Sequence, residues 1–321
     1  MDIEKSIREE AKKLLDEGKV DVLIGYKKGT LPLRSSPAFI RNSEDVDSLI
    51  FDPACSNNLA LYIKRFEGKV GVIAKGCDGR SLTTLVVDRQ IDKDRLFVVG
   101  VPCSGVVDRR KIYAKLDACP RLRSGRGEIA DCQFSDGRVI VRGRDWQESL
   151  DLSAVLSDSC LICRHKTPPV YDLLIGEEIK EEGKPVEELE AFKKKSPDER
   201  WRFFEEELSK CIRCYACRQV CPVCLCEYCI VDRTMPLWFG KTTDLSDTIM
   251  FHLIRAYHTA GRCVDCGACV RACPVGVDFR LLNKRLEDEV KERFGFTAGV
   301  TLGEPAPLSA YKEEDKEEFI M

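Results

Sequence analysis

The chain has 321 residues, of which 44 % are hydrophobic and 33 % are charged, and this balance excludes both a disordered chain and a protein built of membrane spans. Lys and Arg total 51 against 54 Asp and Glu, a net charge of −3 that argues against a nucleic-acid partner recruited by bulk electrostatics. No apolar run approaches the roughly 18 residues of a spanning helix, and the N-terminus lacks the basic and apolar regions of a signal peptide. We therefore expect a cytoplasmic protein of about two domains.

The N-terminal part of the chain predicts an α/β domain with a mixed, partly parallel sheet. A first helix is expected to end at Gly18, where its apolar periodicity stops. The expected strands are 20–24, 69–74, 95–99 and 137–142, the last at an edge of the sheet. A helix over 80–90 joins the second and third of these strands, and this order is typical of a parallel βαβ unit.

The C-terminal part predicts a different, mostly helical architecture. Dense charge with interspersed Gly and Pro marks residues 179–200 as a linker. Helical patterns follow at 199–210, 244–260 and 279–294. Gly295 is placed to cap the last of these helices.

The most informative feature is the set of 18 cysteines, which in a reducing compartment serve as metal ligands or reactive thiols rather than as disulfides. One pattern occurs twice, as Cys211-x2-Cys214-x2-Cys217-x3-Cys221-Pro222 and as Cys263-x2-Cys266-x2-Cys269-x3-Cys273-Pro274. This spacing binds 4Fe-4S clusters, because three cysteines in a tight loop take three corners of one cubane. Structural zinc, the alternative, uses pairs of cysteines separated by a long gap.

The fourth cysteine of each run stands before a proline and faces away from its own loop, and in two-cluster ferredoxins it binds the partner cluster. The expected ligand sets are Cys211, Cys214 and Cys217 with Cys273, and Cys263, Cys266 and Cys269 with Cys221. The long separation of the runs resembles the helical ferredoxin domains of the heterodisulfide reductase and succinate dehydrogenase families. We expect an α/β domain at 1–178, the linker at 179–200, a mostly α-helical ferredoxin-like dicluster domain at 201–295 and an acidic tail at 296–321.

Three more thiols directly follow the first run, namely Cys224, Cys226 and Cys229. One interpretation is chance enrichment of cysteine beside a cluster. The other is part of a further cluster, completed by a cysteine of the N-terminal half, for which Cys55 is the candidate.

Four cysteines of the N-terminal half are candidates for one more 4Fe-4S cluster. Cys77 follows one predicted strand and Cys103 follows the next, so both lie at the carboxyl edge of a parallel sheet, where open α/β sheets bind ligands. Cys160-x2-Cys163 comes later in the chain. A zinc site and ordinary buried thiols are the alternatives.

At these residues the chain resembles the beta-subunit family of coenzyme F420-reducing hydrogenase and formate dehydrogenase. The resemblance rests on the turn Val-Pro-Cys103-Ser-Gly after a buried strand and on the Cys160-x2-Cys163 segment with its downstream Pro, Asp and Gly, and it covers residues 15–178. The family binds FAD and a 4Fe-4S cluster. Its members pass electrons between the deazaflavin coenzyme, or a formate-oxidising subunit, and iron–sulfur chains, so the resemblance implies the same cofactors here.

The candidate residues for FAD are Gly76, Gly79 and Arg80. The two glycines allow close backbone approach, the following helix start offers free N–H groups, and Arg80 adds a positive charge, a combination that suits a pyrophosphate. The same combination equally suits an anionic cluster bound by Cys77. No Gly-x-Gly-x-x-Gly dinucleotide motif is present.

Two functions are consistent with these features. The first is a flavin-containing iron–sulfur subunit of an oxidoreductase, which relays electrons between a formate-, hydrogen- or deazaflavin-linked donor and a heterodisulfide-reductase-type partner. The second is a flavin-free, polyferredoxin-like adaptor with no catalytic site of its own. In both, we expect docking to other redox subunits, with the acidic residues 313–318 as a contact, and release of FAD on denaturation separates the two.

Overall fold

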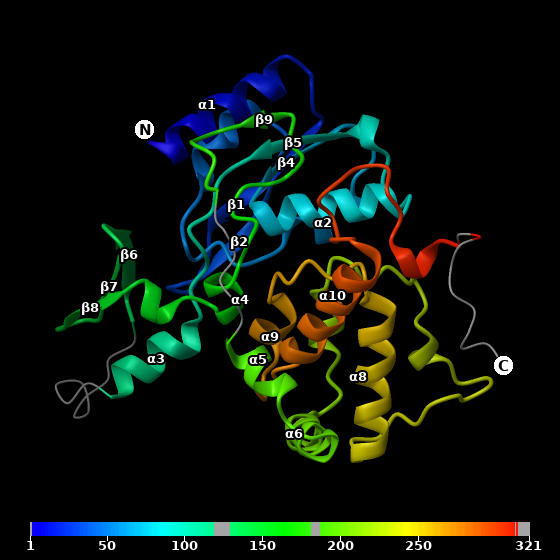
Figure 1. The fold of residues 1–321 in the computed structure, drawn as a ribbon. Coiled ribbons are helices and arrows are strands. Elements are labelled where there is room, and N and C mark those ends of the chain that lie inside the picture. The colour runs from blue at the N-terminus through cyan, green and yellow to red at the C-terminus, as the bar shows by residue number, and fades with distance from the viewer. Residues whose placement is uncertain (1, 119–128, 181–186, 312, 314–321) are drawn as a thin grey trace.

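The computed structural model describes residues 2–118, 129–180, 187–311 and 313 (Figure 1). An α/β half is followed by a helical half, which confirms the predicted fold class. Cys119 and almost all of the acidic residues 313–318 lie outside the described residues. Within the described residues, no helix combines the length and apolar character needed to cross a membrane.

The α/β half is built on a six-stranded sheet in the order β2-β1-β4-β5-β9, with β3 also paired to β1. Its strands are β1 (Val22–Lys28), β2 (Ser35–Ile40), β3 (Leu49–Ile50), β4 (Val70–Ala74), β5 (Leu96–Gly100) and β9 (Leu173–Leu174). The pairs β1–β4, β4–β5 and β5–β9 are parallel, whereas β2 and β3 run antiparallel to β1. The predicted βαβ unit is therefore confirmed as β4-α2-β5.

Helices cover both faces of this sheet. Helix α1 (Ile3–Asp16) buries Ile7, Ala11 and Leu14 against one face, and α2 (Gly76–Val87) buries Leu82 and Leu85 against the other. The strands between them are apolar on both sides, as a sheet covered on both faces requires. The 3-10 turns of the chain are Ser43–Ser48, Leu59–Arg65, Lys93–Arg95, Ser153–Val155, Ile230–Asp232 and Pro307–Ser309.

A second, three-stranded antiparallel sheet consists of β6 (Asp131–Ser135), β7 (Arg138–Arg142) and β8 (Gln147–Asp151). The predicted edge strand at 137–142 is wrong in its placement, because β7 is the central strand of this separate sheet. The sheet extends beside α3 (Arg109–Asp117), which packs Ile112 and Leu116 onto it (Figure 1). The alternation of one strand identifies its buried face, but it does not identify the sheet to which the strand belongs.

The helical half contains all three predicted helices. They are α6 (Pro197–Ser209), α8 (Leu245–Thr259) and α10 (Arg280–Phe294), and shorter helices are α4 (Asp158–Leu161), α5 (Glu187–Lys193), α7 (Ala216–Gln219) and α9 (Ala268–Ala272). Gly295 ends α10 with φ 64°, as a left-handed C-terminal residue does. Helix α5 lies inside the expected linker, yet it packs Leu189 and Phe192 against Leu281 of α10.

The segment after α10 returns to the α/β half. Phe296, Ala298 and Ala306 are buried together with Val264 and Val290, and this segment crosses α2 (Figure 1). Residues 296–306 are therefore part of the packed structure, and the expected tail at 296–321 begins too early. The acidic composition at the extreme C-terminus masked the short apolar residues that precede it.

Candidate metal centres

The first cysteine set surrounds one cavity of the helical half. Cys211, Cys214, Cys217 and Cys273 line this cavity together with apolar residues of α8. Cys273 comes from the second run, so the structure brings the fourth cysteine to the opposite loop. The pKa of the Cys217 thiol is raised to about 11, first by burial, and the thiols of Cys269, Cys211 and Cys273 add to the shift.

The second set has the reciprocal composition. Burial raises the pKa of Cys263, of Cys266 (to about 12) and of Cys269, and in each case the thiol of Cys221 contributes to the shift. Cys221 thus lies with the three cysteines of the other run. Such thiols lose their protons when they bind a metal. This donor set of four cysteines fits a 4Fe-4S cluster, and the same is true of the first set.

The two loops have the same backbone shape, which explains why the same spacing gives the same grouping. Arg213 has φ 54° and Asp265 has φ 51°, each two residues after the first cysteine of its run. Tyr215 (φ 61°) and Gly267 (φ 67°) occupy the next equivalent positions. These left-handed residues fold each loop tightly enough for three thiols to face one point.

The N-terminal thiols also approach one another. Cys77 lies in the first turn of α2 and Cys103 follows β5, whereas Cys160 lies on α4. The Cys103 sulfur accepts from Gly105 N at 3.3 Å, and the Cys160 sulfur accepts from Val106 N at 3.4 Å. Backbone N–H groups that donate to sulfur are a common feature around iron–sulfur clusters.

The pKa shifts give the order of these N-terminal thiols. Burial raises the pKa of Cys103 to about 12, and Cys160 adds to the shift. Burial also raises the pKa of Cys163, with a further contribution from Cys160. For the pKa of Cys77, burial is again the first cause of the rise, followed by charges that include Cys266 of the second set and Cys103.

The second cysteine loop docks directly on these N-terminal loops. Arg271 donates to Cys266 O at 2.9 Å, to Ser157 Oγ at 3.4 Å and to Ser56 O at 2.9 Å. Arg80 donates to Val264 O at 3.1 Å. The N-terminal thiols, the second set and the first set therefore follow one another through the molecule. The outermost set includes Cys214, whose side chain is exposed.

The candidate flavin residues are used for packing instead. A Cβ at Gly76 would lie 1.7 Å from His165 O, and one at Gly79 would lie 2.6 Å from Pro168 Cβ. The Arg80 guanidinium is buried and donates to Ala298 O at 2.9 Å, besides its ion pair with Glu287 at 3.4 Å. These residues do not fit a pyrophosphate, so the assignment of FAD to this loop is wrong. Arg80 is neutralised by segments far away in sequence, which local motifs do not reveal.

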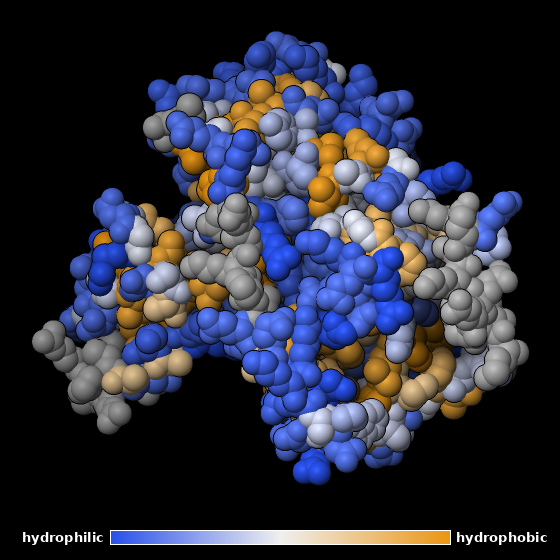
Figure 2. Space-filling view, viewed as in Figure 1, coloured by the Kyte–Doolittle hydropathy of each residue, from blue (hydrophilic) through white to orange (hydrophobic). Residues whose placement is uncertain are grey.

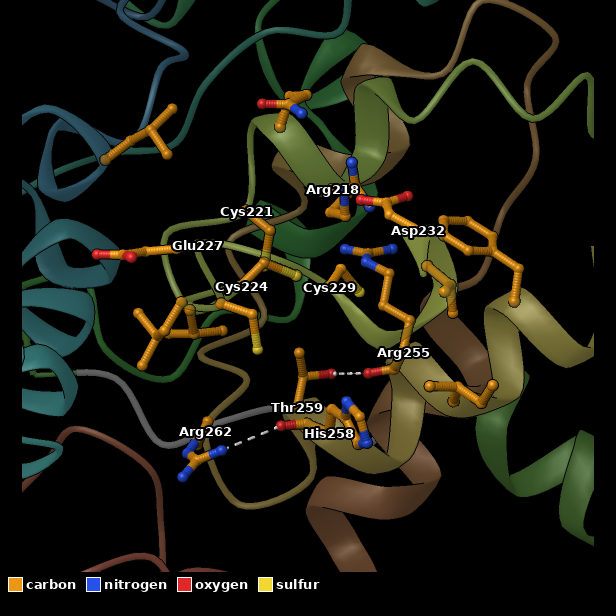
Figure 3. Close-up of a pocket in the computed structure, with 18 residues that line it drawn as sticks. Arg218, Cys221, Cys224, Glu227, Cys229, Asp232, Arg255, His258, Thr259 and Arg262 are labelled. Carbon is orange, nitrogen blue, oxygen red and sulfur yellow. Dashed lines mark hydrogen bonds and ion pairs between the residues drawn. The ribbon is translucent and has the colours of Figure 1, made fainter. Parts of the chain in front are cut away.

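The surplus thiols line the largest cavity, of about 310 Å³ (Figure 3). Cys221, Cys224, Cys226 and Cys229 share this cavity with Arg218, Arg255, Arg262 and His258. Cys55 is not among the lining residues. It is fully buried beside Asp52 in its own loop, and burial raises the pKa of its thiol to about 12. The structure therefore does not bring Cys55 to the surplus thiols.

Two buried cations were missed by sequence reasoning. Lys75 follows β4, forms an ion pair with Asp78 at 2.9 Å and also contacts Tyr26. Burial acts to lower the pKa of Lys75, but Asp78 and the thiols of Cys77 and Cys103 outweigh it. Its position two residues before Cys77 was the available signal. The second cation, Arg255 of α8, has no cysteine near it in sequence, so no local signal marks it.

Comparisons with known proteins agree with this geometry. The family of the coenzyme F420 hydrogenase/dehydrogenase beta chain, described for its carboxyl-terminal part, matches residues 67–187, and the "4Fe-4S dicluster domain" family matches residues 207–277. The chain is 23 % identical over 344 residues to the F420-dependent formate dehydrogenase subunit beta of Methanocaldococcus jannaschii, with 90 % of each chain covered. It is 25 % identical over 362 residues to the F420-dependent formate dehydrogenase 1 subunit beta of Methanococcus maripaludis, covering 92 % of this chain and 91 % of the relative.

One solved structure is also similar. It is a chain of the F420-reducing [NiFe] hydrogenase complex from Methanosarcina barkeri, at 17 % identity and a TM-score of 0.38. The match covers 51 % of this chain and 62 % of that chain.

Proposed function

We propose, from the premise that the chain joins the beta-subunit domain of the coenzyme F420 hydrogenase/dehydrogenase family to a 4Fe-4S dicluster domain, that it is the iron–sulfur electron-transfer subunit of an F420-dependent formate dehydrogenase or hydrogenase. The observation that carries the proposal is the succession of three thiol sets across the contact between the two halves. When bound, each 4Fe-4S cluster accepts and releases one electron. The residues of the chain hold these sites in a fixed order and exclude water from the two inner ones.

The electron path implied by this order begins at the α/β half. Cys77, Cys103, Cys160 and Cys163 are proposed to hold the first cluster of the path. The loop from Cys263 to Cys269 lies next to it, because Arg271 ties the Cys266 carbonyl to Ser157 and Ser56. The path ends at the set that contains Cys214, the exposed thiol.

The exposed end of the path is the proposed docking side for another redox subunit. Beside Cys214, Ile212 is 53 % exposed, and Val275 lines the same cavity and is 37 % exposed. Apolar side chains are also visible on this half of the molecule in Figure 2. Apolar patches of this kind, near a terminal redox site, suit contact with a partner of the formate-oxidising, hydrogen-oxidising or heterodisulfide-reductase type.

Anaerobic purification tests the function directly. Protein isolated with its partners should contain about twelve irons per chain and equal acid-labile sulfide, the sum of three four-iron clusters. The iron–sulfur absorbance should bleach when reduced coenzyme F420 is added to the complex. Stoichiometric zinc with little iron, or bleaching equally fast in the isolated chain with an artificial dye alone, would contradict the proposal.

The flavin-free adaptor is a second candidate, because the loop of Gly76, Gly79 and Arg80 is closed by residues 165–168 and by Ala298. An adaptor without flavin receives single electrons from a partner that carries out the two-electron chemistry. Denaturation of the purified complex, followed by separation of its chains, decides between the two. FAD that stays with this chain until unfolding contradicts the adaptor, whereas FAD found with another chain supports it.

A further inference from the structure

Arg255 lies where the two cysteine sets of the helical half meet. It projects from α8 into the cavity of the surplus thiols, toward Cys221 and Cys224 (Figure 3). Its Nη2 donates to the carbonyl oxygen of Cys217, which belongs to the first set, at 3.1 Å. Its guanidinium also lies within hydrogen-bonding reach of the thiols of Cys221 and Cys269, which belong to the second set. One side chain therefore touches both predicted clusters' ligands.

The charge of Arg255 has no ordinary counter-ion. The residue is only 8 % exposed, and in the described parts of the chain no carboxylate forms an ion pair with it. Its Nε is buried without a hydrogen-bond partner. A buried and unpaired guanidinium is costly unless nearby negative charge compensates it. The available negative charge is that of the cysteine thiolates, with the anionic clusters that they bind.

We propose that Arg255 is a positioning residue shared by the two clusters, and that its positive charge raises their reduction potentials, most of all that of the cluster held by Cys221, Cys263, Cys266 and Cys269. The inference rests on the proposed iron–sulfur function. Reduction adds one electron and one negative charge to a cluster. A fixed cation beside the ligand sulfurs therefore stabilises the reduced form relative to the oxidised form.

The asymmetry follows from the contacts. Toward the first set, Arg255 donates to a backbone carbonyl, so its charge acts there at one remove from the sulfur. Toward the second set, it faces the ligand sulfurs themselves. Cys224 adds a hydrogen bond to Cys221 from the same cavity. The second cluster, which is the middle one of the path, is therefore held at a higher potential than its neighbours and favours electron entry from the α/β half.

The test compares Arg255→Gln with Arg255→Lys in the complete, anaerobically purified complex. Arg262→Gln is the matched control, because Arg262 lines the same cavity but pairs with Asp88 at 2.9 Å. Iron content is measured first, and each cluster is then titrated with dithionite under electron paramagnetic resonance. We expect Arg255→Gln to keep its iron and to lower the reduction equilibrium of the second cluster about tenfold, which is about 59 mV for one electron. Arg255→Lys and Arg262→Gln should stay near wild type.

Each outcome decides the matter. Full iron content with unchanged potentials in Arg255→Gln overturns the proposal. Loss of iron in Arg255→Gln but not in Arg255→Lys supports it, because the charge is then what holds the two loops. Equal loss in both variants makes Arg255 a structural residue only and overturns it. Wild-type protein without iron would instead contradict the proposed function, which keeps the two failures apart.

Discussion

The helical half makes each thiol set from one short loop and a single cysteine of the partner loop, whereas the α/β half gathers its thiols from three separate loops. In the helical half, Arg213 and Asp265 share one left-handed conformation, as do Tyr215 and Gly267, so the grouping is largely a local property. In the α/β half, Cys77 and Cys103 meet only because β4 and β5 are parallel neighbours. Local spacing therefore specifies the first kind of site, and the whole fold specifies the second.

The largest effect is expected where the two loops exchange ligands. Cys221→Ser should remove about four irons and abolish the electronic signal of the cluster bound by Cys263, Cys266 and Cys269, although Cys221 belongs to the other run. Because metal binding and folding are coupled in such small sites, the variant should also unfold at a lower temperature. Iron analysis and electron paramagnetic resonance of the anaerobic protein check this.

Cys224→Ser is the matched control, since Cys224 lies in the same cavity and hydrogen-bonds to Cys221. It should keep its full iron content. A loss of about four irons there would show that the surplus thiols hold a further cluster. Loss of the first set's signal in Cys221→Ser would break the reciprocal grouping.

The α/β half gives the next effect. Cys103→Ser should also lose about four irons, but its thermal unfolding should change less, because the large sheet and its two helical layers stay packed without the cluster. Cys132→Ser, on β6 of the second sheet, is the control and should keep all its iron. Full iron content in Cys103→Ser would make Cys103 an ordinary buried thiol.

Much of this arrangement could be predicted from the sequence, and the exceptions have a common physical cause. Spacing was enough to predict α6, α8 and α10 and the two cysteine runs, because the period and the loop geometry are local. The role of Arg80 was not predictable, since its acceptors Val264 and Ala298 lie in the other half of the chain. The same limit applies to β7, whose partner strands form a sheet that its own pattern does not specify.

Arg80 provides a smaller effect that sharpens the contrast between local and distant contacts. Arg80→Ala leaves the buried carbonyls of Ala298 and Val264 without their donor and should destabilise the protein by about 3 kcal/mol. Arg95→Ala is the control, because Arg95 also donates to two carbonyls, Gly68 O and Phe66 O, but at the exposed surface; its cost should stay below about 1 kcal/mol. Thermal unfolding of both variants measures the difference. Loss of bound FAD from Arg80→Ala, with unchanged stability, would restore the flavin assignment.

The smallest effect is expected at Cys55, the thiol that the fold keeps apart from every set. Its sulfur accepts from Asp52 N at 3.4 Å and is fully buried among apolar residues of the sheet. Cys55→Ala removes one buried sulfur and should cost about 1 kcal/mol, with no change in iron, in sulfide or in any cluster potential. Denaturant unfolding and iron analysis of the same sample test both parts. A variant that loses iron at wild-type stability would show that this thiol reaches a cluster, and that distant cysteines of the α/β half are gathered more widely than the fold indicates.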